Sequence, residues 1–304
     1  MSGAHRIMGT HSFTSPLRYP GGKGMLTNFA KLLISLNRLT GGDYVEIYAG
    51  GASIAWALLF DGYVKNVHIN DISKPIYSFW KSVLKRTDEF CQLIQDTPVT
   101  IEERTHQRQV QLNPKRYSLL ELGFSTFFLN RTNRAGILTG GVIGGKEQSG
   151  KWKLDARFNK TDLIARIQRI AQYSSCIHLH NKDAATFIKD QLPKIPQKSL
   201  VYLDPPYYAK GDSLYENYYS HEDHKAIAEL VSNINQPWAV SYDNVTPIAK
   251  LYENYRSIEY KLSYSVQDRY AGSEIIFFSQ NLLVPEIKDP SRVKINKIFV
   301  PALF

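Results

Sequence analysis

The chain has few cysteines and no long apolar run. Its 304 residues include only Cys91 and Cys176, which lie far apart and lack the spacing of a metal site. This usage fits a reducing cytoplasm, in which both serve as small buried side chains. The short, interrupted apolar runs exclude a membrane-spanning helix. The first dozen residues also lack the apolar core of a secretion signal, so we expect an intracellular protein.

Internal repeats, low-complexity segments and long blocks of one charge sign are also missing. The net charge is nevertheless +9, from 37 Lys and Arg against 28 Asp and Glu. Basic residues alternate with aromatic ones, which is typical of a structured binding face rather than a disordered basic tail. A polyanionic partner fits this balance, but charge alone does not identify it, because many basic proteins never contact nucleic acid.

The remaining pattern predicts an α/β fold. A hydrophobic content of 43% provides a large core, for one domain with a sizeable insertion or for two domains. Strand-like runs alternate with helical patterns, and Pro75 suits the first turn of a helix. We therefore expect a mainly parallel sheet with helices on both faces. The predicted strands are residues 44–47, 67–70, 177–180, 200–203, 238–242, 258–262 and 274–279, and the helices between them are residues 52–60, 184–191 and 221–234.

One stretch interrupts the alternation. Residues 86–173 contain helical patterns at 101–111 and 117–128, followed by a glycine-rich loop at 131–153. Between Arg86 and Arg169 there are 14 Lys and Arg against 9 Asp and Glu, which is more than half of the basic excess of the chain. This stretch reads as an inserted, basic, mostly helical module.

The most informative motif is Asp204-Pro205-Pro206-Tyr207, directly after a predicted strand. Two prolines must end that strand because they lack the N–H that a sheet ladder needs. The strand therefore presents a carboxylate and an aromatic ring at its carboxyl end, where open α/β sheets bind ligands. A carboxylate, free backbone carbonyls and a ring suit the binding of a flat heterocycle through its amino group.

This motif resembles the catalytic motif of the amino-methyltransferases of nucleic acids, and the chain as a whole resembles Dam-type DNA adenine methyltransferases. The likeness runs from Leu17 to Val284, with the motifs in the family's order. Tyr48 stands where the family commonly has Phe, and Ile47 where it often has Pro. The supporting motifs are Arg18-Tyr19-Pro20-Gly21-Gly22-Lys23, residues 43–53, Ile69-Asn70-Asp71-Ile72, Phe127-Phe128-Leu129-Asn130-Arg131 and residues 270–280.

The resemblance implies a Rossmann-like methyltransferase sheet with an inserted helical target-recognition domain. Residues 13–85 and 174–287 would form the catalytic domain, and residues 86–173 would bind DNA. Residues 1–12 would be a loose arm. The segment after Pro285 receives no role.

The resemblance further implies methyl transfer from S-adenosylmethionine to the exocyclic amino group of an adenine flipped out of duplex DNA. That nitrogen is a poor nucleophile because its lone pair is delocalised into the ring. Asp204 and the carbonyl of Pro205 would each accept a hydrogen bond from this amino group, in a turn completed by Pro206. The two hydrogen bonds would favour a tetrahedral nitrogen. Tyr207 would stack on the base.

A second set of residues is expected to bind the methyl donor. Gly50 allows the backbone to approach the ligand, and Asp71 follows a strand as ribose-binding carboxylates do. Lys23 suits the carboxylate of the donor, although it also reads as a surface lysine. A helix cap is the less favoured alternative for Asp71, whereas Asp183 reads nearly as well as a helix cap as it does as a ligand contact. The full predicted donor set is Tyr19, Lys23, Tyr48, Gly50, Asp71, Asp183 and Asp204.

The glycine-rich loop is expected to contact DNA through Arg131, Arg134, Lys146 and Lys151, with solvated surface charge as the alternative. It is not a phosphate-binding loop, because Glu147 stands where Ser or Thr is needed. Two histidine pairs lack a third ligand, so we expect no metal site. The tyrosines at 208, 215, 218 and 219 would cover the flipped base or belong to the core, and residues 270–272 would form a second wall of the DNA cleft.

Other functions stay open at this point. The methylated amino group would instead belong to a cytosine in DNA or to an adenine in RNA. A glutamine in a protein is disfavoured, because glutamine methyltransferases typically have Asn at the position of Asp204. A catalytically silent DNA-binding relative is the rival outside enzymes. We expect a monomer in the cytoplasm, associated with the nucleoid. Double-stranded DNA would be its partner, and a cognate restriction endonuclease would form no stable complex with it.

Overall fold

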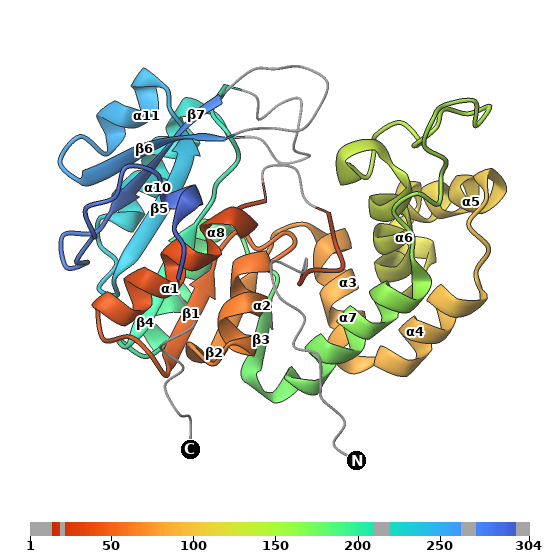
Figure 1. Ribbon diagram of the computed structural model, residues 1–304, viewed down its shortest axis with the longest axis horizontal. Coiled ribbons are helices and arrows are strands. Elements are labelled where there is room, and N and C mark those ends of the chain that lie inside the picture. Colours follow the sequence, from red (N-terminus) through yellow and green to blue (C-terminus); the bar gives the residue numbers. More distant parts are fainter. Residues whose placement is uncertain (1–13, 19–21, 210–218, 263–271, 296–304) are drawn as a thin grey trace, which may run out of the picture.

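The computed structural model describes residues 14–18, 22–209, 219–262 and 272–295, so Tyr19, Tyr215, Tyr218 and the expected N-terminal arm lie outside the described residues. Its centre is one seven-stranded sheet with the order β3-β2-β1-β4-β5-β7-β6 (Figure 1). Among the described strands, β7 alone runs opposite to the other six, so its pairings with β5 and β6 are antiparallel. The predicted α/β fold with a mainly parallel sheet is confirmed. The strands are β1 (Gly42–Glu46), β2 (Val64–Asn70), β3 (Ile177–His180), β4 (Ser199–Leu203), β5 (Trp238–Asp243), β6 (Arg256–Leu262) and β7 (Gly272–Phe278).

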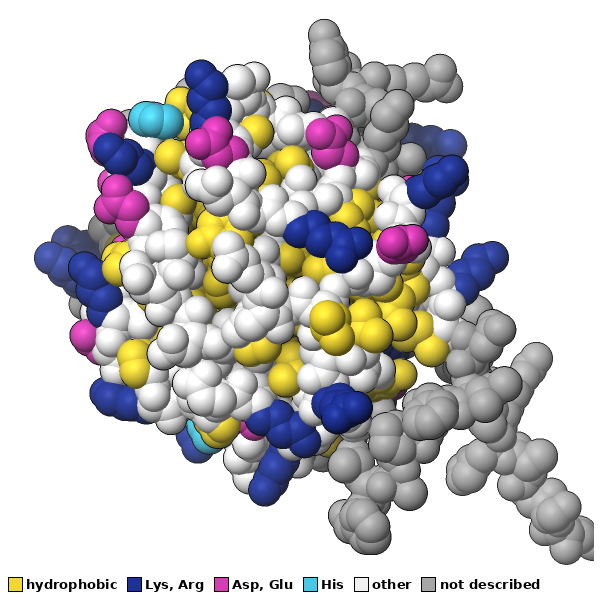
Figure 2. Space-filling view, turned by 90° about the vertical axis from the view of Figure 1, so that its left-hand side faces the viewer, with side chains coloured by type: hydrophobic (Ala, Val, Ile, Leu, Met, Phe, Trp, Pro, Cys, Tyr) yellow, Lys and Arg dark blue, Asp and Glu magenta, His cyan; other side chains and the backbone are white. Residues whose placement is uncertain are grey.

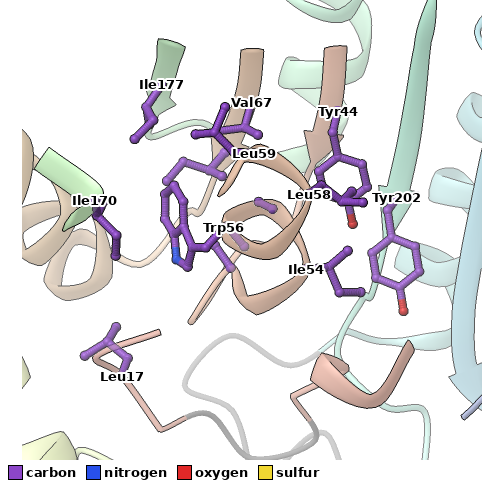
Figure 3. Close-up of a cluster of buried hydrophobic side chains, with 14 of the residues drawn as sticks. Leu17, Tyr44, Ile54, Trp56, Leu58, Leu59, Val67, Ile170, Ile177 and Tyr202 are labelled. Carbon is purple, nitrogen blue, oxygen red and sulfur yellow. The ribbon is translucent and has the colours of Figure 1, made fainter. Parts of the chain in front are cut away.

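Helices cover both faces of the sheet, and neighbouring residues of its central strands belong to two different cores. In β1, for example, Tyr44 belongs to one core and Val45 to the other. The first core is closed by α1 (Thr27–Leu36), α2 (Ser53–Phe60) and α3 (Lys74–Lys85), and the second by α8 (Ala184–Asp190), α10 (His221–Val231) and α11 (Thr246–Leu251). Figure 3 shows Trp56 and Leu58 of α2 next to Val67 of β2 and Tyr44 of β1.

The strand order defines where a ligand site belongs. The chain moves outward from β1 to β2 and β3, and then crosses back to β4 on the other side of β1. The carboxyl ends of β1 and β4 therefore flank the point at which the winding direction reverses. In open α/β sheets that crevice binds ligands.

The helical segment between α3 and β3 lies beside the sheet, on the right of Figure 1. It consists of α4 (Thr87–Asp96), α5 (Ile101–Leu112), α6 (Leu119–Thr132) and α7 (Lys160–Gln172). Helix α6 is almost wholly buried, and Gly123 allows it to approach α3 closely, because a Cβ there would lie 2.6 Å from the Ser78 carbonyl oxygen. The two helices predicted in this segment are confirmed, whereas α4 and α7 were not predicted.

The described end of the chain returns to the first layer of helices. The Asn28 amide of α1 donates to the Val293 carbonyl at 2.9 Å, and Arg256 donates to the Val284 carbonyl at 2.9 Å. None of the described helices combines the length and the apolar character that a membrane crossing requires.

Candidate active site

Asp204 follows the last residue of β4, as the two prolines predicted. Its side chain is 20% exposed. Oδ1 accepts a hydrogen bond from the Ser241 hydroxyl of β5 at 2.7 Å, and Ser241 in turn bonds the Tyr202 hydroxyl at 2.7 Å. On its other side, Lys23 Nζ lies 2.9 Å from Oδ1 and 3.1 Å from Oδ2. The carboxylate is thus fixed between two elements and still reaches the surface.

Lys23 is a buried cation, with a side chain only 2% exposed. Its ammonium lies 3.5 Å from Glu274 Oε2 and donates to the Tyr207 hydroxyl at 3.1 Å. Burial alone would lower the pKa of Lys23, but the carboxylates of Asp204 and Glu274 outweigh it and raise the pKa above its ordinary value. The predicted donor-binding lysine is therefore neither solvated nor neutral, and it is paired with the predicted catalytic carboxylate.

Glu274, at the start of β7, was not among the predicted site residues. The Tyr207 hydroxyl donates to Oε1 at 2.5 Å, and the Tyr260 hydroxyl of β6 donates to Oε2. Its side chain is 2% exposed. The one available signal in the sequence was an acidic residue directly before the apolar run Ile275-Ile276-Phe277-Phe278. Tyr207 is buried as well, so this hydrogen bond fixes the orientation of the ring predicted to stack on the base.

The pKa of Asp204 reflects these neighbours. Burial and the charge of Glu274 raise it, whereas Lys23 and the Ser241 hydroxyl lower it, and the net effect is a pKa above the ordinary value for aspartate. Glu46, at the end of β1, is a further buried carboxyl that was not predicted as a site residue. Burial and then Asp204 raise its pKa well above the usual range, and its Oε2 makes no hydrogen bond within the described residues.

The glycine turn after β1 lies next to Asp71 at the end of β2. Gly50 has φ +46°, which favours glycine, and its N–H donates to Asp71 Oδ2 at 2.9 Å. Asp71 Oδ1 accepts from the Ser73 N–H at 2.9 Å, and burial raises the pKa of Asp71 to about 6. Two buried indoles hold the carbonyls of the turn: Trp80 Nε1 donates to Gly50 at 2.8 Å and Trp56 Nε1 to Gly51 at 3.1 Å.

The other two predicted donor contacts have structural partners. The Tyr48 hydroxyl lies 3.1 Å from that of Tyr219, and their rings meet edge to face. Asp183 is exposed and caps α8, because its Oδ1 accepts from the N–H groups of Ala185 at 2.9 Å and Thr186 at 3.2 Å. Asp183 therefore has the helix-cap arrangement that the sequence left open, and Tyr219 packs against core residues.

The turn after Tyr207 is fastened to β5. Asp243 accepts from the N–H of Tyr208 at 2.9 Å and from that of Ala209 at 2.9 Å. Beside it, an open groove of about 390 Å³ is lined by Tyr208, His221, Thr246, Pro247, Lys250 and Leu251. Of the predicted histidine pairs, His224 bonds the Tyr242 hydroxyl at 3.2 Å and His178 stacks on His68.

The predicted DNA-contact residues fall into two groups. The Arg131 guanidinium donates to the Arg157 carbonyl at 2.7 Å, and burial followed by the charge of Arg18 lowers its pKa to about 10. Arg134, Lys146 and Lys151 are exposed. The loop that carries these three residues lies on the right of Figure 1. The opposite, left-hand face has Lys and Arg scattered among acidic and apolar side chains (Figure 2).

The loop that carries them is organised by buried polar residues that the sequence did not reveal. Asn133 is fully buried, accepts from Arg104 Nε at 2.8 Å, and donates to the carbonyls of Ile137 at 2.9 Å and Leu138 at 2.8 Å. Asn130 of α6 joins this loop to the amino-terminal motif, because its amide bonds both the N–H and the carbonyl of Arg18.

Comparison with known proteins gives a family and a weak structural likeness. Residues 19–266 match the family described as D12 class N6 adenine-specific DNA methyltransferase. No curated protein sequence shows significant similarity to the chain. A candidate RNA methyltransferase from Pyrococcus horikoshii is 10% identical, with a TM-score of 0.41 over 86% of this chain and 85% of the other. TrmK of M. capricolum, solved with S-adenosyl-homocysteine, is 10% identical, with a TM-score of 0.34 over 83% of this chain and 69% of the other.

A third structure, precorrin-6y C5,15-methyltransferase from Geobacter metallireducens, is 11% identical, with a TM-score of 0.33 over 82% of this chain and 85% of the other. These scores are too low to carry a functional argument. The family match instead covers most of the chain and includes Lys23, the glycine turn, Asp71 and the Asp204 motif. The chain therefore belongs to the D12 class N6 adenine-specific DNA methyltransferases, enzymes that use S-adenosylmethionine as the methyl donor.

Proposed function

We propose that this methyltransferase acts on adenine in double-stranded DNA after the base has rotated out of the helix into the crevice at Asp204. The observation that carries the proposal is the position of this carboxylate. It follows β4 at the reversal point of the sheet and is partly exposed, whereas Lys23 and Glu274 behind it are buried. A base inside a duplex cannot reach a carboxylate so placed, because its amino group is paired.

Asp204 would accept one hydrogen of the exocyclic amino group, and the Pro205 carbonyl the other. This arrangement withdraws the nitrogen lone pair from the ring and directs it at the methyl carbon. Pro206 keeps the turn out of a helix, and Tyr207 provides the ring that flanks the base. Asp204 need not be a strong base, since N6 loses its proton readily once it carries the methyl group.

The donor pocket would lie at the carboxyl ends of β1 and β2. S-adenosylmethionine supplies an electrophilic methyl carbon there. Asp71 fits a ribose because it is a carboxylate beside a glycine turn, and Gly50 leaves room for close approach. The buried Glu46 Oε2, without a partner in the described chain, offers an acceptor in the same region. The proposed set of donor-binding residues is completed by Lys23, Tyr48, Asp183 and Tyr19. Tyr19 lies outside the described residues.

The segment at 86–173 is proposed to be the DNA-binding, target-recognition part, with residues 13–85 and 174–287 as the catalytic part. Arg134, Lys146 and Lys151 would contact phosphates or bases from the exposed loop. Arg131 would act mainly by holding the loop to residue 157, because its guanidinium is hydrogen-bonded there. We further propose that a monomer acts at the nucleoid and forms no stable complex with a restriction endonuclease.

The test is product analysis with tritiated S-adenosylmethionine. Duplex DNA, single-stranded DNA and RNA are incubated with the enzyme, and the nucleosides are identified by mass spectrometry. We expect N6-methyldeoxyadenosine, formed in duplex DNA. Asp204→Ala should lower kcat by about 10²- to 10³-fold, as expected for loss of a positioned transition-state hydrogen bond, and should retain DNA affinity.

Asp190→Ala, on the exposed end of α8, is the matched control and should keep full turnover. Methylcytosine as the product, methylation of RNA alone, or an Asp204→Ala variant with full turnover would each contradict the proposal.

A further inference from the structure

A partly exposed carboxylate, Asp204, and a buried one, Glu274, share one buried cation in this site. Lys23 Nζ contacts both oxygens of Asp204, at 2.9 and 3.1 Å, and lies 3.5 Å from Glu274 Oε2. Asp204 Oδ1 also accepts from Ser241. Oδ2 is thus the oxygen of Asp204 with fewer described donors, and Lys23 is the described donor with which a substrate amino group would compete there.

A lysine displaced from Asp204 still needs a counter-ion. Its side chain is 2% exposed, and a buried charge that is left without its partner is strongly destabilising. Glu274 is the second carboxylate within reach, and its side chain is equally buried. A small movement of the flexible lysine stem would exchange a 3.5 Å contact for a hydrogen bond.

Glu274 is itself well fixed. Its two oxygens accept from different tyrosines, Oε1 from Tyr207 and Oε2 from Tyr260. Tyr260 is its direct neighbour across the antiparallel pair of β6 and β7. The carboxylate therefore stays in place when the lysine moves, and its hydrogen bond to Tyr207 keeps the ring of the catalytic motif oriented.

We propose that Glu274 is a positioning residue that retains the Lys23 ammonium while Asp204 Oδ2 accepts the amino group of the target adenine. The inference rests on the proposed function, because it assumes that Asp204 binds this amino group. Glu274 acts through Lys23 and touches neither the base nor the donor. Without Glu274, Lys23 would remain on Asp204 and compete with the substrate.

The test is steady-state kinetics of Glu274→Gln in the full chain. We expect kcat to fall about 30-fold or more, as for loss of one partner of a buried ion pair, with KM for DNA and donor changed less than about threefold. Glu259→Gln makes the same chemical change at an exposed position of the adjacent strand β6 and should leave kcat unchanged. An unchanged kcat in Glu274→Gln overturns the inference.

A double-variant cycle separates this role from a general structural one. On a Lys23→Met background, which is itself impaired, adding Glu274→Gln should change kcat by less than about threefold, because the cation that Glu274 holds is gone. If the two effects multiply, Glu274 does not act through Lys23 and the inference is wrong. Thermal unfolding of each variant shows whether it is folded.

If Glu274→Gln does not fold, Tyr260→Phe replaces it. This variant removes one hydrogen bond from Glu274 and keeps its charge, so kcat should fall about threefold to tenfold at unchanged KM; an unchanged kcat overturns the inference. Failure of the proposed function looks different, because the wild-type enzyme would then form no methyladenine in duplex DNA.

Discussion

The candidate active site at the strand ends and the loop at residues 133–158 both depend on buried polar groups. The two regions use these groups differently. At the strand ends, the carboxylates of Asp204, directly after β4, and Glu274, in β7, both pair with the Lys23 ammonium. In the loop, the neutral amide of Asn133 bonds backbone carbonyls only a few residues away. The first arrangement holds charges at the proposed active site, and the second holds a loop in shape.

This difference gives the two regions different sensitivities. A buried charge whose partner is removed loses its pairing energy and disturbs the ionisation of its neighbours. A buried amide that is removed leaves carbonyls without donors and releases the local backbone. Changes in the sheet should therefore appear in turnover and pH dependence, and changes in the loop in stability and DNA affinity.

The variant that should distinguish the two regions most clearly is Asn133→Ala. The change removes two donors to carbonyls and the acceptor of Arg104, so the free energy of unfolding should fall by about 3 kcal/mol. DNA affinity should fall with it while donor affinity stays unchanged. Chemical denaturation and titrations with DNA and donor measure these three quantities.

The control is Asn113→Ala at the end of α5, where the amide makes one exposed hydrogen bond to the Gln109 carbonyl, and it should cost less than about 1 kcal/mol. Equal losses of donor and DNA affinity in Asn133→Ala would show that the two regions are not independent.

An effect of intermediate size is expected on donor affinity when pH changes the ionisation of Asp71. Its pKa is raised to about 6, so it holds its proton below that pH and is ionised above it. If ionised Asp71 binds the ribose, donor affinity should be constant above about pH 7 and weaken by about tenfold per unit below about pH 6. Calorimetric titrations between these limits measure it.

Asp71→Asn should bind the donor more weakly and without this pH dependence. A wild-type affinity that does not change with pH would mean that Asp71 serves only to fasten the glycine turn and the start of α3.

The smallest effects are expected for single basic residues of the loop. Replacing Arg134, Lys146 or Lys151 by Ala should weaken DNA binding by about twofold to fivefold each and reduce the slope of log K against log salt by about 1 for each lost phosphate contact. Lys225→Ala, on the exposed side of α10, should leave both quantities unchanged. A loop variant that matches this control is not part of the DNA interface.

The sheet was predictable because its signals are local. All seven strands lie where apolar runs and turn residues indicate, with ends that differ by at most three residues from the predicted ones. Helices α1, α4, α7 and α11 were not predicted. In α7, for example, Leu163, Ile167 and Ile170 recur at helical spacing and are fully buried.

The site was predictable only in part, for a physical reason. Asp204 is placed by its own strand and prolines, so the sequence around it suffices. Glu274 reaches Lys23 and Tyr207 because β7 returns antiparallel between β5 and β6, and no local pattern encodes that pairing. Asn133 likewise owes its role to a loop geometry that includes Gly136 at φ +80°, where a Cβ would lie 2.5 Å from the Arg18 carbonyl oxygen.

The two indole N–H groups behind the glycine turn extend the proposed donor pocket into the hydrophobic core. Trp56 and Trp80 are inaccessible to solvent and pack against each other with ring centroids 4.8 Å apart, and each fixes one carbonyl of the turn. The shape that a nucleoside would meet is thus set by side chains it never touches. Any engineering of cofactor preference at this proposed pocket would have to include the two tryptophans.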